Sequence, residues 1–292
     1  MRTEQEMLEL ILSAASRDER VRAVAMNGSR TNANAPKDLF QDYDIVYLVT
    51  EVEPYLREPD WIDAFGERIV MQRPDDNDAL FTSERRSRYA YLMLFADGNR
   101  IDLTLVPWTE RDAYLAEDKL TVVLMDKDGS LPAIPPPTDE DYRVRRPGAE
   151  HFRGCCNEFW WVSTYVAKGL WRRELLYALE HLGIVRAMLL KMLAWRVGLD
   201  TGFAVSVGKS YKYLEKYVPE DVWGRLLRSF PGGAYESAWT ALFEMGELFR
   251  ETARDVAARS SFFYDEEEDR RVTEYLRRVE ALPRASEPPS TT

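Results

Sequence analysis

The sequence has few of the residues that define secreted, membrane-embedded or histidine-rich metal proteins. Its only cysteines, Cys155 and Cys156, are adjacent, which excludes a disulfide framework and the spaced ligands of a zinc site. Its only histidines, His151 and His181, exclude a histidine-rich metal site and give histidine general-base chemistry little support. No apolar run approaches the roughly 20 residues of a membrane helix, and the acidic start at 1–6 is unlike a signal peptide. We therefore expect a cytoplasmic protein with no membrane partner.

An excess of positive charge is also lacking. The chain carries 39 Lys and Arg against 50 Asp and Glu, a net charge of −11 at pH 7. Because binding along a nucleic acid needs a basic surface, this balance argues against a nucleic-acid partner. The acidity lies in the first half, where residues 1–140 hold 16 basic against 28 acidic residues, while residues 141–292 hold 23 against 22. The acidic excess serves solubility, or it produces a field that attracts a polycationic small substrate.

The first half of the chain alternates helical and strand patterns. Thr3 and Glu6 have the spacing of a capping box before an amphipathic helix. A second helix is predicted between Thr109 and Asp118. Apolar and β-branched runs predict strands, and the Asp-Gly turn signal in 96–99 predicts a hairpin between two of them. The predicted strands are 21–26, 45–50, 88–95, 100–106 and 121–125.

Helical patterns dominate the second half. An acidic run at 265–269 is placed to start the last helix, because carboxylates are stabilised at the positive end of the helix dipole. The tail at 283–292 is expected to fray. The predicted helices are 150–170, 172–197, 209–216, 219–229, 234–259 and 265–282.

Prolines separate the two halves. The segment 128–147 contains five prolines and one glycine, a composition that cannot propagate a helix or a sheet ladder. We therefore predict a first domain at 1–135, a linker at 136–149 and a second domain at 150–292. The fold class is α+β, with a mixed sheet flanked by helices followed by an all-helical bundle.

The chemistry-bearing residues lie around the first two predicted strands. Gly28 and Ser29 follow the first strand, and a glycine–serine step there exposes backbone N–H groups and a hydroxyl to an anion such as phosphate. Asp42 and Asp44 lie two residues apart at the start of the next strand, so their carboxylates point to the same face. Paired carboxylates with substrate phosphates suit Mg²⁺. The alternative is a common turn followed by solvated charges at a strand entry.

A third carboxylate, Asp102, lies in an otherwise apolar predicted strand. An unpaired acid there would be costly to desolvate, so we expect a partner or a metal ion beside it. If this strand neighbours the one that starts at Ile45, Asp102 faces Asp42 and Asp44. It then completes a metal site, or it takes a proton from an attacking hydroxyl.

At these residues the sequence resembles a known family. The segments 28–30, 40–45 and 97–107 look like the nucleotidyltransferase fold as it occurs in aminoglycoside 6-adenylyltransferases. The segments 151–170 and 208–214 are similar to the helical domain of that family. The glycine–serine and paired-aspartate pattern is shared by all nucleotidyltransferases, whereas the Cys-Cys-Asn-Glu-Phe-Trp-Trp run narrows the resemblance to the 6-adenylyltransferases.

The resemblance implies a reaction and its participants. The chain would transfer AMP from ATP to a hydroxyl of an aminoglycoside, the 6-position of the streptidine ring of streptomycin, and so inactivate the antibiotic. ATP would be the co-substrate and Mg²⁺ the cofactor. By this resemblance Ser29 would contact the ATP phosphates, Asp42 and Asp44 would hold Mg²⁺, and Asp102 would be the catalytic base, a metal ligand or both. The turn itself adds Gly28 as a phosphate-binding residue, and Arg30 beside it could neutralise phosphate charge. Arg30 is equally suited to a structural role.

In the second half of the chain, the candidate binding residues belong to no specific motif. Lys209 and Lys212 are placed to reach the triphosphate, or they are solvated lysines. Trp161 and Tyr165 are four residues apart on one helix face, where a guanidinium of streptidine can stack, although most such aromatics belong to a core. The remaining candidates for binding the cationic substrate are the acidic residues Glu158 and Glu174.

Two other functions stay open. One is a nucleotidyltransferase of the same fold that acts on another acceptor, such as a protein side chain or a nucleic-acid end. The other is a protein that binds a nucleotide or an antibiotic without turnover. We expect a monomer or a weak dimer.

Overall fold

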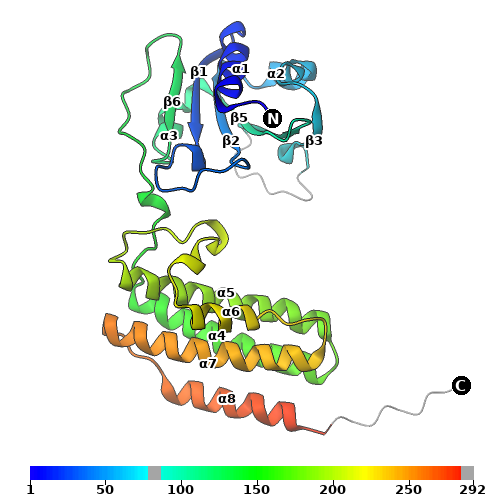
Figure 1. The fold of residues 1–292 in the computed structure, drawn as a ribbon, viewed down its shortest axis with the longest axis vertical. Helices are drawn as coiled ribbons and strands as arrows, with labels where there is room; N and C mark the ends of the chain where they lie inside the picture. Colours follow the sequence, from blue (N-terminus) through cyan, green and yellow to red (C-terminus); the bar gives the residue numbers. More distant parts are fainter. Residues whose placement is uncertain (78–86, 284–292) are drawn as a thin grey trace, which may run out of the picture. The chain divides into compact units, whose positions relative to one another are not determined.

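The computed structural model describes residues 1–77 and 87–283. The chain divides into two compact units, Met1–Asp141 (unit 1) and Tyr142–Thr292 (unit 2) (Figure 1). The division lies inside the proline-marked segment 136–149. The predicted fraying of 283–292 falls, beyond Pro283, outside the described residues. In the ranges that the structure describes, no helix is long and apolar enough to cross a membrane.

Unit 1 is built on a six-stranded mixed sheet of order β3-β4-β5-β2-β1-β6. β2 and β5 run parallel, and every other neighbouring pair runs antiparallel. The strands are β1 (Val21–Asn27), β2 (Tyr43–Val49), β3 (Arg68–Gln72), β4 (Tyr89–Phe95), β5 (Arg100–Pro107) and β6 (Val122–Asp126).

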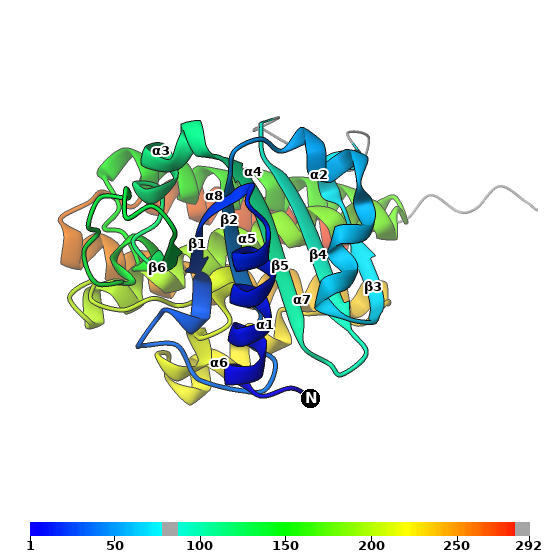
Figure 2. The same ribbon diagram turned by 90° about the horizontal axis from the view of Figure 1, so that it is seen from above.

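Helices cover both faces of this sheet. α1 (Glu4–Arg17) starts at the predicted capping box, in which the Thr3 side chain accepts from the Glu6 amide and the Glu6 carboxylate accepts from the Thr3 amide. α1 lies over one face of the sheet in Figure 2 and, with α2 (Glu53–Arg57), packs on the larger apolar cluster. α3 (Arg111–Leu115) places Tyr114 in the smaller cluster on the other face.

The five predicted strands are confirmed within two residues at either end. The predicted hairpin is also confirmed, since the Phe95 amide donates to Asn99 O and Gly98 adopts φ +84°. The sequence did not reveal β3, an edge strand with two of its five residues partly buried and three exposed. The helix predicted to reach Asp118 is shorter than expected and ends at Leu115.

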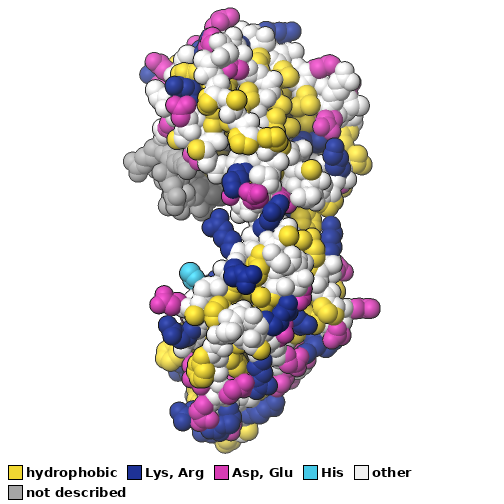
Figure 3. Space-filling model, turned by 90° about the vertical axis from the view of Figure 1, so that its left-hand side faces the viewer, with side chains coloured by type: hydrophobic (Ala, Val, Ile, Leu, Met, Phe, Trp, Pro, Cys, Tyr) yellow, Lys and Arg dark blue, Asp and Glu magenta, His cyan; other side chains and the backbone are white. Residues whose placement is uncertain are grey.

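Unit 2 consists of five α-helices in the described range. They bury a single apolar core, in which Phe159 and Phe249 stack with ring centroids 3.8 Å apart and Trp160 lies against both rings. On the face of unit 2 seen in Figure 3, side chains of both charge signs are interspersed, as expected for a solvated surface. The helices are α4 (Ala149–Trp171), α5 (Leu175–Asp200), α6 (Glu220–Arg228), α7 (Tyr235–Ser260) and α8 (Glu266–Ala281).

The prediction of a helix over 209–216 is wrong. This segment forms two short 3-10 turns, Lys209–Tyr211 and Leu214–Lys216. The reason is local, because Ser210 and Tyr211 adopt φ +55° and +62°, which an α-helix does not allow. The prediction for the acidic run is confirmed, since the Asp265 side chain accepts from the amides of Glu267 and Glu268 at the start of α8.

Candidate active site

Gly28 forms the turn that ends β1. It adopts φ +76°, a conformation that side-chain-bearing residues rarely adopt. A Cβ atom at this position would lie 2.0 Å from Oδ2 of Asp44. Glycine is therefore required twice, for the backbone angle and for the close approach of the carboxylate. This turn continues directly into a 3-10 turn over Gly28–Arg30, which contains Ser29.

The acids of β2 and β5 lie on one face of the sheet. Strand residues alternate between faces, and Ile45 and Leu103 both belong to the larger apolar cluster. Their neighbours Asp44 and Asp102 therefore point to the opposite face. Asp44 pairs directly with Asp102 in the parallel register, and Asn27 pairs with Asp44 on the other side. The neighbouring strands that carry Asn27, Asp44 and Asp102 are about 4.8 Å apart.

Arg100 connects two of these acids. Its Nε and Nη2 atoms donate to the two carboxylate oxygens of Asp102, each at 2.7 Å. Its Nη1 atom lies 3.6 Å from Oδ2 of Asp42. The pKa of Arg100 is raised, chiefly by the hydrogen bonds to Asp102 and then by the charges of Asp102, Asp42 and Asp44, while partial burial opposes the shift. All three predicted acids therefore act on one guanidinium.

Arg30 secures the loop between β1 and β2. Its Nε and Nη2 atoms donate to the carbonyl oxygens of Asp42 and Gln41 at 3.1 and 2.8 Å, and its guanidinium lies 3.7 Å from the ring centroid of Tyr43. The Gln41 amide in turn donates to the backbone and hydroxyl oxygens of Ser29. These contacts hold Asp42 beside the glycine–serine turn, which is the structural role left open for Arg30. A contact of Arg30 with phosphate stays a prediction.

Sequence reasoning missed the residues that hold Asn27. The Tyr114 hydroxyl donates to the Asn27 side-chain oxygen at 2.5 Å, and the Asn27 amide donates to Oγ1 of Thr121 at 2.7 Å. Burial raises the pKa of Tyr114, so the hydroxyl stays a donor. No spacing connects these three residues along the chain. Arg100 was missed as well, although its position two residues before Asp102 places both side chains on one face.

The acids are chemically suited to a hard divalent cation. Asp42 and Asp102 already converge on one cationic group, and their oxygens are the ligands that Mg²⁺ prefers. Within residues 1–77 and 87–283, no three His, Cys, Asp or Glu side chains are grouped closely enough to hold a metal ion. The assignment of Asp42, Asp44 and Asp102 as metal ligands therefore stays a prediction, and Arg100 is the cation that contacts two of them.

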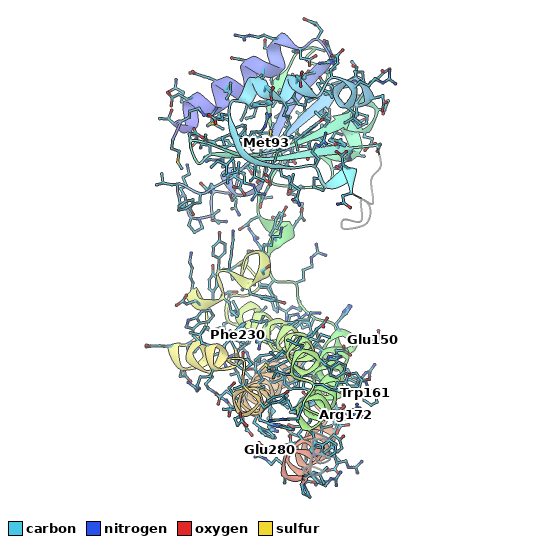
Figure 4. The ribbon with its side chains drawn as sticks, turned by 90° about the vertical axis from the view of Figure 1, so that its right-hand side faces the viewer. Met93, Glu150, Trp161, Arg172, Phe230 and Glu280 are labelled. Atoms are coloured by element: carbon cyan, nitrogen blue, oxygen red, sulfur yellow. The ribbon has the colours of Figure 1, made fainter. Side chains whose placement is uncertain are left out.

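The predicted substrate-binding residues lie in unit 2. Glu158, Trp161 and Tyr165 have the i, i+3 and i+7 spacing of one side of α4. Trp161 is 58% exposed (Figure 4). The Trp161 indole N–H donates to the Tyr165 hydroxyl at 2.6 Å. Lys168 Nζ lies 4.8 Å from the Tyr165 ring centroid. Trp161 is therefore a surface residue held in a fixed position, whereas Trp160 belongs to the core.

The remaining candidates of unit 2 are exposed and lie at two other places. Glu174 directly precedes α5, where its amide donates to Gly169 O. Lys209 and Lys212 belong to the strained turn after Gly208, and Lys212 Nζ lies 5.1 Å from the Tyr213 ring centroid. The structure does not bring these residues into one cluster with Trp161. Their roles in binding substrate and triphosphate stay predictions.

Comparisons with known proteins identify relatives along nearly the whole chain. A family model described as streptomycin adenylyltransferase matches residues 1–279. The aminoglycoside 6-adenylyltransferase of Bacillus subtilis (strain 168) is 44% identical over 277 residues, which is 94% of this chain and 97% of the relative. The protein of the same name from Campylobacter jejuni is 43% identical over 265 residues, covering 90% and 91%. A crystal structure of an aminoglycoside 6-adenyltransferase from Bacillus subtilis is 38% identical, with a TM-score of 0.48 and coverage of 97% and 100%.

These relationships define the class of protein. The chain is an enzyme of the nucleotidyltransferase class. Within it, the chain belongs to the streptomycin adenylyltransferase family. The resemblance that the sequence motifs indicated is thereby confirmed.

Proposed function

We propose that this enzyme transfers AMP from ATP to a hydroxyl of an aminoglycoside, with the 6-hydroxyl of streptomycin's streptidine ring as acceptor. The observation that carries the proposal is the register pair of Asp44 with Asp102 beside the Gly28 turn. It places acids from two strands next to backbone that suits a phosphate. The names of the relatives supply the class of acceptor.

The proposed reaction is a displacement at the α-phosphorus of ATP. The acceptor oxygen forms a bond to phosphorus while the bond to the bridging oxygen breaks, and pyrophosphate leaves with that electron pair. The acceptor proton moves to a carboxylate oxygen of Asp102. Asp42 and Asp44 would hold Mg²⁺, which supplies stabilisation of charge on the phosphoryl oxygens. The backbone of Gly28 and Ser29 orients the phosphates.

The reaction is tested by mass spectrometry with the full chain, ATP, Mg²⁺ and a panel of aminoglycosides. Streptomycin should gain one AMP, and NMR of the product should place it on the 6-oxygen. Asp42→Asn and Asp44→Asn should abolish transfer, and Asp102→Asn should slow it by roughly 10²–10⁴-fold, the usual contribution of a general base. Asp128→Asn, which affects an ion pair with Arg22, is the matched control and should keep full activity.

The outcomes separate the other functions. AMP found on protein or nucleic acid instead of on the drug would show that the acceptor is not an aminoglycoside. Binding of ATP and drug without any product would leave a binding protein. Unchanged turnover in Asp42→Asn or Asp44→Asn would contradict the proposed metal ligands.

We further propose that Trp161 stacks on a guanidinium of the drug. Its exposed indole is fixed by Tyr165, and Glu158 on the same helix side adds a negative charge. A guanidinium over an indole contributes about 0.5–2 kcal/mol, so Trp161→Ala should raise KM for streptomycin by about 2- to 30-fold. KM for ATP should not change.

Two variants control this test. Trp161→Phe keeps an aromatic face but loses the hydrogen bond to Tyr165, and it should stay near the wild-type KM. Phe263→Ala removes another aromatic residue of unit 2, one that is 80% exposed, and should have no effect. An unchanged KM in Trp161→Ala would show that the drug does not contact this face.

A further inference from the structure

Arg100 contacts two of the predicted acids of the site. Its guanidinium occupies both oxygens of Asp102 and also lies within ion-pair distance of Asp42. These carboxylates are the groups that nucleotidyl transfer needs for a proton and a cation. A positive side chain between them therefore satisfies the acids in the protein as it stands, and it competes with their use in the reaction.

This contact adds little to the stability of the fold. The Arg100 side chain is 42% exposed and the Asp102 side chain 21%, and such pairs contribute at most about 1 kcal/mol to stability. Arg88 in the same unit provides a contrast, because it is 12% exposed and ties Glu110 and Glu117 to the start of β4. Arg88 joins separate segments, whereas Arg100 and Asp102 are neighbours on one strand. The contact therefore serves the charges of the site.

We propose that Arg100 takes the place of the divalent cation in the metal-free enzyme and releases Asp42 and Asp102 when the cation enters with the nucleotide. This inference rests on the proposed function. The Arg100 side chain is 42% exposed, and the two acids that it contacts hold it from one side, so it can rotate toward solvent. A released guanidinium can pair with phosphate oxygens, a contact for which its planar shape is suited.

The exchange has a measurable consequence for the cation alone. Without nucleotide, a divalent cation must displace Arg100 and gains no phosphate ligand in return. Removing the guanidinium takes away a competing positive charge, which strengthens the attraction of these carboxylates for another cation. Arg100→Gln should therefore tighten binding of Mn²⁺ in the absence of nucleotide by about tenfold, which corresponds to one charge-assisted hydrogen bond.

The experiment is a Mn²⁺ titration of the full chain followed by electron paramagnetic resonance. Arg100→Lys keeps the charge without the two-pronged contact and should fall between wild type and Arg100→Gln. Arg22→Gln is the matched control, because Arg22 also forms a partly exposed ion pair with an aspartate of unit 1, Asp128. It should bind Mn²⁺ as the wild type does.

A second readout is thermal unfolding with EDTA and with Mg²⁺. Arg100→Gln should unfold at a slightly lower temperature than wild type in EDTA, because its acids repel one another. Mg²⁺ should raise the Tm of Arg100→Gln by more than it raises the Tm of wild type.

Equal or weaker Mn²⁺ binding in Arg100→Gln than in wild type, including no detectable binding in both proteins, would overturn the inference. If Arg100→Gln does not fold, Arg100→Lys decides in the same way. Failure of the proposed function is distinct, since it appears as wild-type enzyme that makes no AMP–drug product.

Discussion

Among single residues, Gly28 is the most constrained position of the site. Two separate demands meet there, a positive φ and a carboxylate oxygen where a Cβ would lie. Asp44 owes its position beside the turn to the missing side chain. The same contact explains why a glycine, and not merely a small residue, precedes Ser29.

Gly28→Ala should therefore lose both stability and activity. The positive φ costs about 1–2 kcal/mol and displacement of Asp44 adds to it. A shift of about 1 Å at Asp44 is enough to lower turnover by about 100-fold. Urea unfolding and the AMP-transfer assay measure the two effects.

Gly129→Ala separates the two demands. Gly129 also has a positive φ, +61°, but no atom lies within 4 Å of its ideal Cβ. This variant should lose about 1 kcal/mol of stability and keep its activity. Equal turnover in Gly28→Ala and Gly129→Ala would show that the contact with Asp44 is unimportant.

At the scale of elements, the β4–β5 hairpin is fastened to the start of the chain. Asp97, in the hairpin turn, accepts from Arg2 Nε at 2.7 Å and from the Arg2 amide at 2.9 Å. Arg2 also donates to Phe65 O, and Asn99 donates to Arg2 O. These contacts hold the hairpin turn directly before Arg100, the first residue of β5, and so they bear on the position of the site.

The stability that the contacts of Asp97 contribute should depend on pH. The Arg2 hydrogen bonds, aided by Asn99 and opposed by partial burial, hold the pKa of Asp97 well below its ordinary value of 3.8. A lowered pKa contributes stability that is present above the unfolded-state pKa and is lost as pH falls toward the folded-state pKa. Asp97→Asn should therefore lower the free energy of unfolding by about 1 kcal/mol at pH 7.

The difference between Asp97→Asn and wild type should shrink as the pH falls below about 4. Urea unfolding at pH 7, 5 and 3 measures it. Glu53→Gln, which affects an exposed ion pair with Arg57, should change stability little at pH 7. A difference that is equally large at pH 3 would assign the role of Asp97 to packing instead of charge.

Over the whole molecule, the two units keep separate cores. The core of unit 1 lies on the two faces of the sheet, and Met93 at its centre is fully buried (Figure 4). The core of unit 2 lies among its helices. The acidic half of the sequence coincides with the unit that holds the carboxylates, and both predicted roles of this charge, solubility and attraction of a cationic substrate, stay predictions.

Local sequence patterns predicted most of the elements. The Thr3 cap, the Asp97-Gly98 turn and the Asp265 cap were predicted because each depends on hydrogen bonds between near neighbours in the chain. The edge strand β3 and the 3-10 turns after Gly208 were not, because pairing with β4 and left-handed backbone angles leave no periodic signal.

The sequence alone established the family and the candidate acids, because those depend on residue identity and order. Which acids meet was decided by strand pairing: the parallel register puts Asp44 beside Asp102, although they are far apart along the chain. The pairing of β2 with β5 also decided the contacts of Arg100, because it brings Asp42, directly before β2, within reach of the Arg100 side chain. Contacts between distant segments arise from packing free energy summed over the sheet, which no short stretch of sequence contains.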